Sequence, residues 1–134
     1  MFIVPEASFF LSHRLPLARA AIANGYQVMV ACPPSPETAE LTKNGITHLP
    51  LAMPRGAGRL MGELHSLRQH YQLLKTCQPD LVHLVTAKPM LYGGLAARRQ
   101  GIPSVSAVTG LGFVFIRQDL KALVLRQIIK IGYR

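Results

Sequence analysis

Hydrophobic and polar positions along the chain fall into two alternating patterns. Short apolar runs bounded by Gly or Pro are typical of buried strands. Longer stretches repeat their apolar residues at the spacing of an amphipathic helix. The runs predict five strands, at 2–4, 26–32, 46–51, 81–85 and 104–108. The repeats predict helices at 12–24, 37–44, 59–77, 89–100 and from about 117 to the end.

Individual residues set the predicted helix boundaries. Ser12 is expected to cap the first helix, with Pro16 in its first turn and Gly25 as its left-handed stop. Gly45 and Gly101 are expected to end the second and fourth helices. In the longest helix, apolar residues at helical spacing predict a buried face: Leu60, Leu64, Leu67, Tyr71 and Leu74.

Strands that alternate with helices pair in parallel through right-handed crossovers, which predicts a doubly wound α/β sheet. In such sheets ligands bind outside the carboxyl ends of the strands. This rule selects three loops for the candidate site, at 5–13, 86–89 and 109–113.

Side chains in the first two loops suit an anionic ligand. His13 beside Arg14, at a strand-to-helix junction, can bind phosphate or carboxylate; the alternative is a surface histidine that caps a helix. Thr86 and Lys88 place a hydroxyl and an ammonium at the edge of the sheet. An anion site and a solvated lysine are both open here.

Glycines occur at two places where backbone can approach a ligand. Gly110 and Gly112, after the fifth strand, permit such an approach or serve only a tight turn. Gly56 and Gly58 have the spacing of a dinucleotide fingerprint but follow the third strand, and no acidic residue closes a second strand. A loop is therefore favoured at 56–58 over dinucleotide binding, and no P-loop sequence occurs.

No metal site is predicted, because the histidines fit no ligand spacing. His65 and His70 are five residues apart and face different sides of one helix. His48 and His83 lie inside predicted strands, where a structural role is favoured.

Composition fits one folded domain. The chain has 134 residues, 49% apolar and 16% charged, which excludes a disordered protein. The longest charge-free apolar stretch, 101–116, is too short and too interrupted for a membrane-spanning helix. The start lacks the basic region of a secretory signal. Cys32 and Cys77 lie far apart, which indicates two reduced thiols in a cytoplasmic protein.

The formal net charge is +9, and all of it lies beyond residue 54. This asymmetry indicates an anionic partner: nucleic acid, an acidic membrane surface or phosphorylated substrates. Residues 117–134 predict a helix with one apolar half and Arg126, Lys130 and Arg134 on the opposite side. Such a helix suits an anionic membrane surface, although an ordinary helix packing its apolar half fits as well.

Six segments taken together carry a family resemblance: 9–18 (FFLSHRLPLA), 25–28 (GYQV), 79–84 (PDLVHL), 88–98 (KP and YGGLAAR), 101–103 (GIP) and 108–112 (VTGLG). They resemble the N-terminal half of bacterial family 4 glycosyltransferases over essentially the whole chain. The resemblance is closest to the subgroup that adds sugars to polyprenyl-diphosphate-linked glycans for capsule, O-antigen or glycoprotein assembly.

The resemblance implies a GT-B enzyme, with two Rossmann-like domains and the active site in the cleft between them. In that family the N-terminal domain mainly binds the acceptor, and the C-terminal domain holds the nucleotide sugar through a Glu-x7-Glu motif. This chain contains no such pair. Residues 1–116 would form the acceptor-binding domain and 117–134 a basic amphipathic helix, truncated before the donor domain. The family uses no metal, and no cofactor is expected beside the nucleotide-sugar donor.

The resemblance also places the cleft. Many members carry a histidine near the reacting sugar where Thr109 and Gly110 stand here, so the catalytic group is unassigned. The residues expected to line the acceptor side of the cleft are Ser8, His13, Arg14, Thr86, Lys88, Thr109, Gly110 and Gly112.

The expected function is the acceptor-binding domain of a hexosyltransferase in surface polysaccharide or glycan biosynthesis. Its partners would be a lipid-linked glycan acceptor and an anionic membrane surface, with a cytoplasmic, peripheral location at the inner face of the cell membrane. The chain alone is expected to be inactive. One alternative is a non-catalytic subunit that docks a separately encoded catalytic half. The other, a small basic nucleic-acid-binding domain, is disfavoured because Tyr71 and Tyr92 lie in predicted helices.

Overall fold

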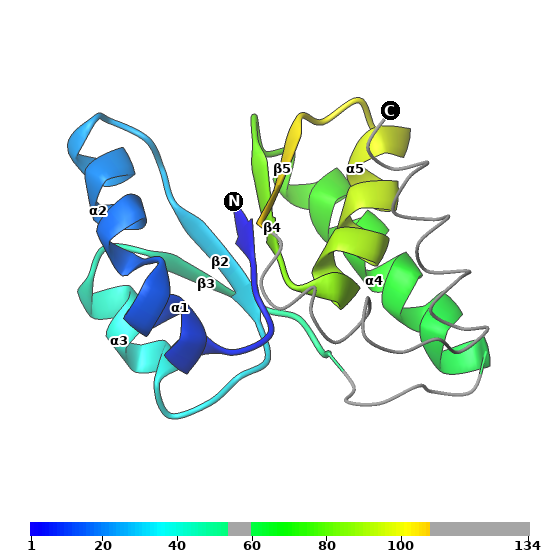
Figure 1. Cartoon of the computed structure of the whole chain (residues 1–134), viewed down its shortest axis with the longest axis horizontal. Coiled ribbons are helices and arrows are strands. Elements are labelled where there is room, and N and C mark those ends of the chain that lie inside the picture. Colours follow the sequence, from blue (N-terminus) through cyan, green and yellow to red (C-terminus); the bar gives the residue numbers. More distant parts are fainter. Residues whose placement is uncertain (54–59, 108–134) are drawn as a thin grey trace, which may run out of the picture.

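A parallel sheet of five strands forms the centre of the computed structural model, which describes residues 1–53 and 60–107 (Figure 1). The strand order is β3-β2-β1-β4-β5. The sequence order therefore reverses between β1 and β4, at the centre of the sheet. The strands are β1 (Phe2–Ile3), β2 (Met29–Cys32), β3 (Thr47–Pro50), β4 (Val82–Val85) and β5 (Ser104–Ala107).

Helices cover both faces of this sheet (Figure 1). The first face carries α1 (Ala7–His13), α2 (Leu15–Ala23) and α3 (Thr38–Lys43). The second face carries α4 (Leu60–Cys77) and α5 (Gly94–Arg99), and a π-helical turn, η1 (Pro89–Gly93), leads into α5. The doubly wound α/β fold predicted from the alternation of strands and helices is confirmed.

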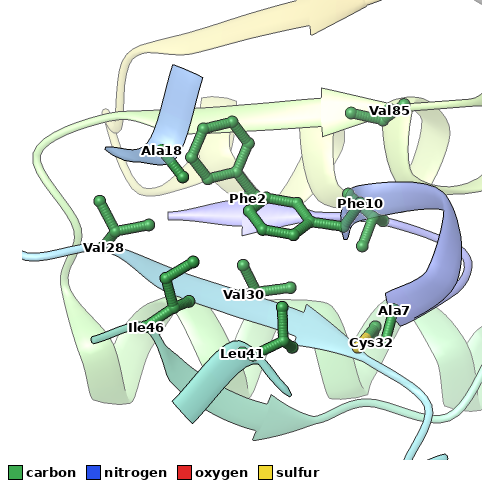
Figure 2. Packing of buried hydrophobic residues seen from close by; sticks show 11 residues of the cluster. Phe2, Ala7, Phe10, Ala18, Val28, Val30, Cys32, Leu41, Ile46 and Val85 are labelled. Atoms are coloured by element: carbon green, nitrogen blue, oxygen red, sulfur yellow. The ribbon is translucent and has the colours of Figure 1, made fainter. Parts of the chain in front are cut away.

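The core consists of two clusters, because alternate residues of a strand point to opposite faces. On the first face, Phe2 meets Phe10 of α1 edge to face, with ring centroids 5.3 Å apart (Figure 2). On the second face, Ile3 and Leu84 pack with Leu74 of α4. β1 is thus buried on both sides, as expected for the central strand of a parallel sheet.

The first helix begins earlier than predicted. It starts at Ala7, and the expected N-cap role of Ser12 is wrong. The Ser12 hydroxyl instead donates to the Ser8 carbonyl, at 3.0 Å, from inside α1. Burial of Ala7 and Phe10 on one side of the helix accounts for the earlier start, since both pack into the first-face core. Pro16 lies in the first turn of α2, as predicted.

The glycines predicted to end helices do so, whereas the predicted buried face of α4 is only partly correct. Gly25, Gly45 and Gly101 all have the positive φ of a left-handed helix stop, which confirms them. On α4, however, Leu64 is exposed, and the fully buried positions are Ser66, His70 and Leu74. The buried stripe is rotated from the predicted one because the side chains of α4 also pack against η1.

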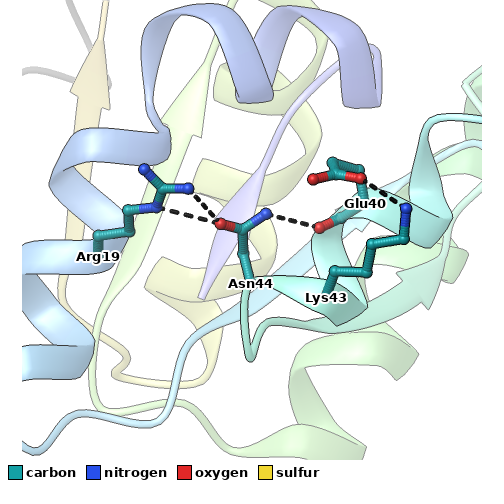
Figure 3. A network of polar contacts seen from close by, with 4 residues as sticks. All are labelled: Arg19, Glu40, Lys43 and Asn44. Atoms are coloured by element: carbon teal, nitrogen blue, oxygen red, sulfur yellow. Dashed lines mark hydrogen bonds and ion pairs between the residues drawn. The ribbon is translucent and has the colours of Figure 1, made fainter.

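A polar network ties α2 to the end of α3 (Figure 3). The Arg19 guanidinium donates from Nε and Nη2 to the Asn44 side-chain oxygen, at 3.1 and 2.7 Å. The Asn44 amide donates to the Glu40 carbonyl at 2.8 Å, and the Lys43 ammonium pairs with the Glu40 carboxylate at 3.1 Å. These contacts fix the relative position of the two helices on the first face.

Gly93 allows the second-face helices to approach the sheet closely. A Cβ at this position would lie 2.6 Å from Leu84 Cδ2 and 3.3 Å from Ile3 Cδ1, both fully buried. At the neighbouring Gly94, a Cβ would lie at an ordinary 3.6 Å from Leu84. Only the first glycine is therefore required by packing.

We expect the free energy of unfolding of Gly93→Ala to be about 1–3 kcal/mol lower than that of Gly94→Ala. The reason is that only the substitution at residue 93 overpacks the core. Both substitutions gain similar helix propensity, so their difference isolates the packing cost. Urea unfolding followed by circular dichroism measures this difference. Equal stability of the two variants would show that the contact with Leu84 is relieved without cost.

Candidate functional site

The carboxyl ends of β1 and β4 meet at one edge of the sheet, because the two strands pair directly. Phe2 pairs with His83 and Ile3 with Leu84. The chain leaves β1 into α1, and it leaves β4 into the helical stretch that begins at Ala87 and includes η1. At this point, where the strand order reverses, an open α/β sheet offers its binding crevice.

Three of the predicted site residues follow these two strand ends. Ser8 lies in the first turn of α1, while Thr86 and Lys88 follow β4 directly. Thr109, Gly110 and Gly112 lie outside the described residues, so their part in the site stays a prediction.

Glu6 belongs to the same edge, although it was not among the predicted site residues. It is the N-cap residue of α1 and is exposed. The Ser8 hydroxyl lies 3.5 Å from the Glu6 carboxylate, a weak hydrogen bond. Its position in the 5–13 loop after the first strand was the signal in the sequence that could have identified it.

Thr86 holds a strained backbone at the end of β4. Its φ of 74° is unusual for a β-branched residue and costs about 1–3 kcal/mol. The Thr86 carbonyl accepts a hydrogen bond from the Met90 amide at 3.1 Å. This turn redirects the chain from the strand into the following helix, whose first amides therefore lie at the carboxyl edge.

His13 lies at the far end of α1 and not at a helix start. It is six residues beyond Ala7, roughly 9 Å along the helix at 1.5 Å per residue. Its ring stacks on Phe9 with centroids 4.6 Å apart, and its Nδ1 lies 2.6 Å from the Ser12 hydroxyl. The exposed imidazole is therefore fixed by its own helix, away from the turn at Thr86.

Arg14 lies close enough to His83, in the middle of β4, to act on it electrostatically. It is half-buried, and its Nε has no hydrogen-bond partner. Burial lowers the pKa of His83, and the nearby Arg14 guanidinium lowers it further. The His83 ring stacks on Phe2, with centroids 5.0 Å apart. The Arg14 charge therefore lies near His83, which is three residues before Thr86 along β4.

His70 is a buried histidine on α4, only 1% exposed. Its Nδ1–H donates to the Ser66 carbonyl at 2.7 Å, while Nε2 has no partner. The ring lies against Tyr92 of η1, with centroids 5.7 Å apart. Burial lowers the pKa of His70, against the opposing effect of the Ser66 hydrogen bond, so the ring is held in its neutral form.

The chemistry open to the remaining groups is limited. Burial raises the pKa of Cys32 to about 11, so this thiol stays protonated and is a poor nucleophile at neutral pH. Within residues 1–53 and 60–107, no group of His, Cys, Asp and Glu side chains is arranged to hold a metal ion. Across the same ranges, no helix has the length and apolar character needed to cross a membrane.

The Glycosyl transferase 4-like family matches residues 1–134, and the chain belongs to this family. No curated relative matches it in sequence. Solved structures share its fold, and two of them are glycosyltransferases with the following similarity. MurG from Acinetobacter baumannii is 22% identical with a TM-score of 0.58, over 80% of this chain. A glycosyltransferase from Rickettsia africae is 16% identical with a TM-score of 0.63, over 89% of this chain.

The chain spans 33% of the length of each of these two structures. Its parallel five-stranded sheet with flanking helices matches the N-terminal half of GT-B glycosyltransferases. The family and the fold expected from the sequence motifs are therefore confirmed.

We expect the protein to lose stability as pH falls below the ordinary histidine pKa of 6.5, because the unfolded chain then takes up a proton that folded His70 resists. His70→Leu should show a shallower loss between pH 7 and pH 5, while the lowered pKa of His83 still contributes. Urea unfolding at a series of pH values measures the slopes. His65→Leu, which removes a histidine from the exposed side of the same helix, is the control for the substitution itself. An unchanged slope in His70→Leu would contradict this assignment.

Thr86→Gly should be at least as stable as the original chain, since glycine adopts positive φ without the strain that threonine bears. Thr86→Ala keeps a Cβ and should retain most of that strain. Thermal unfolding compares the variants. If Thr86→Gly is the less stable of the two, the backbone at this turn is not strained.

Proposed function

We propose that the chain is the acceptor-binding domain of a glycosyltransferase that moves a sugar from a nucleotide-sugar donor to a lipid-linked or glycan acceptor. The acceptors we favour are polyprenyl-diphosphate-linked glycans of surface polysaccharide or glycoprotein assembly. The observation that carries the proposal is the edge formed by β1 and β4, in a chain that belongs to the Glycosyl transferase 4-like family. Anion-binding and hydroxyl-binding groups follow the two paired strands there.

The side after β4 suits the acceptor diphosphate. The first amides of a helix have no intrahelical carbonyl partner, and the helix dipole favours an anion at this end. Ala87 and Lys88 supply such amides, and Pro89 follows without one. In this proposal the Lys88 ammonium and the Thr86 hydroxyl add charge and a further donor.

The side after β1 suits the sugar of the acceptor. The Glu6 carboxylate accepts hydrogen bonds, and the Ser8 hydroxyl both donates and accepts them. A sugar hydroxyl can therefore be oriented between them. The reacting group stays unassigned, and His13 and Arg14 would act around this edge and not at its centre.

The donor sugar would be bound by a second domain. The chain spans a third of the two related structures and has no Glu-x7-Glu pair. We therefore propose that the chain alone transfers no sugar and that it uses neither metal nor cofactor. The same coverage supports the alternative of a partner subunit that docks a separately encoded catalytic half.

The proposed location is cytoplasmic and peripheral to the inner membrane face, which is consistent with the basic charge beyond residue 54.

Geranyl diphosphate, a short polyprenyl diphosphate, should bind the chain in isothermal titration calorimetry. We expect Lys88→Met to weaken this binding about tenfold, because a charge-assisted hydrogen bond contributes roughly 1.5–3 kcal/mol. Lys43→Met removes an equal charge from α3, where the ammonium pairs with Glu40, and should leave the affinity unchanged. Equal loss in both variants, or equal binding of geraniol without its diphosphate, would contradict the proposal.

A further inference from the structure

The first face of the sheet leaves apolar side chains exposed over β4 and β5. His83 and Val85 of β4 lie on this face, since His83 stacks on Phe2 and Val85 packs beside Phe2 in the first-face core (Figure 2). Val105 of β5 is the register partner of His83, so it lies on the same face, and it is 49% exposed. Leu81, two residues before His83, continues the alternation and is 48% exposed.

One flank of α2 borders this exposed area. Ala18 of α2 is fully buried, and the following residue, Arg19, reaches Asn44 at the end of α3 (Figure 3). Since α3 packs on β3, this flank of α2 faces the β3 side of the sheet. Leu17 precedes Ala18 and therefore lies on the opposite flank, toward β4, because successive helix residues are about 100° apart. Leu17 is 48% exposed.

A cationic group lies among these apolar side chains. Burial lowers the pKa of His83, and the Arg14 guanidinium and the Met1 ammonium, both close by, lower it further. The Nε of Arg14 is buried without a hydrogen-bond partner. A buried N–H of this kind favours an occupant that brings an acceptor. We call the residues of this area the β4–β5 surface: Arg14, Leu17, Leu81, His83 and Val105.

The shape of the β4–β5 surface suits one helix. Parallel sheets are found with helices over both faces. On the second face α4 and α5 provide this cover, whereas on the first face the described helices extend only as far as α2. A helix about 10 Å in diameter spans two neighbouring strands that lie about 4.8 Å apart. It would bury Leu17 on its side and Leu81 and Val105 beneath it.

We infer that the β4–β5 surface binds an amphipathic helix of a partner chain that carries a carboxylate on its apolar side. The apolar side chains bind the helix, and the Arg14 guanidinium accounts for the carboxylate, since an ionised acid enters an apolar contact only when it is paired. This inference goes beyond the proposed function and does not depend on the acceptor.

Charge distinguishes this occupant from two others. Residues 117–134 contain five basic residues and one acidic residue, Asp119, so their charge does not complement Arg14. A second copy that paired through the same surface would bring its own Arg14 and His83 against the first pair, because a two-fold contact is made by identical patches. An acidic partner helix avoids both conflicts.

Two designed peptides test the inference by fluorescence anisotropy with the full chain. The first is rich in alanine, about 18 residues long, and has a stripe of leucines with one glutamate inside the stripe. The second has the same composition, with the glutamate moved to the opposite side of the helix. We expect the first peptide to bind roughly fivefold more tightly, although both have the same net charge.

Variants of the chain assign the binding to named residues. Val105→Ser should weaken binding of the first peptide roughly fivefold, because it removes apolar area that the helix covers. Arg14→Gln should abolish the difference between the two peptides. Leu64→Ser and Arg99→Gln change exposed residues on the second face and are the matched controls, which should bind both peptides like the original chain.

An absence of binding, equal binding of the two peptides, or an equal loss in Val105→Ser and Leu64→Ser would overturn the inference. Dimerisation that depends on Val105, seen by analytical ultracentrifugation, would assign the surface to a second copy instead. Nuclear Overhauser contacts between Val105 and residues 117–134 without peptide would assign it to the same chain, and both results overturn the inference. Geranyl diphosphate binding is measured without peptide, so failure of the proposed function is distinguishable from each of these results.

Discussion

The pairing of β1 with β4 is the contact on which the remaining structure depends. β1 has only two residues, yet it is buried on both faces and hydrogen-bonds to β2 on one side and β4 on the other. Phe2 contributes to the core beneath α1 and α2, while Ile3 contributes to the core beneath α4 and α5. Because the strand order reverses at this pair, the contact that joins the two halves of the sheet also creates the kind of edge at which open α/β sheets bind ligands.

Close packing on the second face positions one half of that edge. Gly93 brings η1 against Leu84, and His70 with Tyr92 fills the space between η1 and α4. The strained turn at Thr86 then directs the first helical amides toward the carboxyl edge. The strain is local, and burial of the following helix against β4 holds it in place.

Much of the fold follows from signals that are local in the sequence. Glycines at 25, 45 and 101 end helices because they alone adopt positive φ without cost, and the apolar runs between them pair as strands. The start of α1 was not predictable in this way, because burial of Phe10 outweighs the capping preference of Ser12. The burial of His70 was not predictable either. This polar residue becomes part of the core because η1 packs over α4, which is a tertiary contact.

The positions of the candidate site residues were predicted in part, for the same reason. Thr86 and Lys88 were placed correctly at the end of a strand, because the rule about strand ends depends only on topology. His13 was not placed correctly, since its position depends on where α1 begins, and Glu6 was omitted although it lies in the loop between β1 and α1. Side chains whose position is set by a strand end were therefore predictable, and those set by a helix boundary were not.

The central claim is that the β1–β4 edge binds a diphosphate-bearing acceptor, and amide chemical shifts of the 15N-labelled chain test it most directly. On titration with geranyl diphosphate, we predict shifts that concentrate at residues 6–8 and 86–88. Gly25, Gly45 and Gly101, at the helix ends on the opposite edge, should stay unchanged. Shifts centred on those glycines, or absent from both strand ends, would contradict the account.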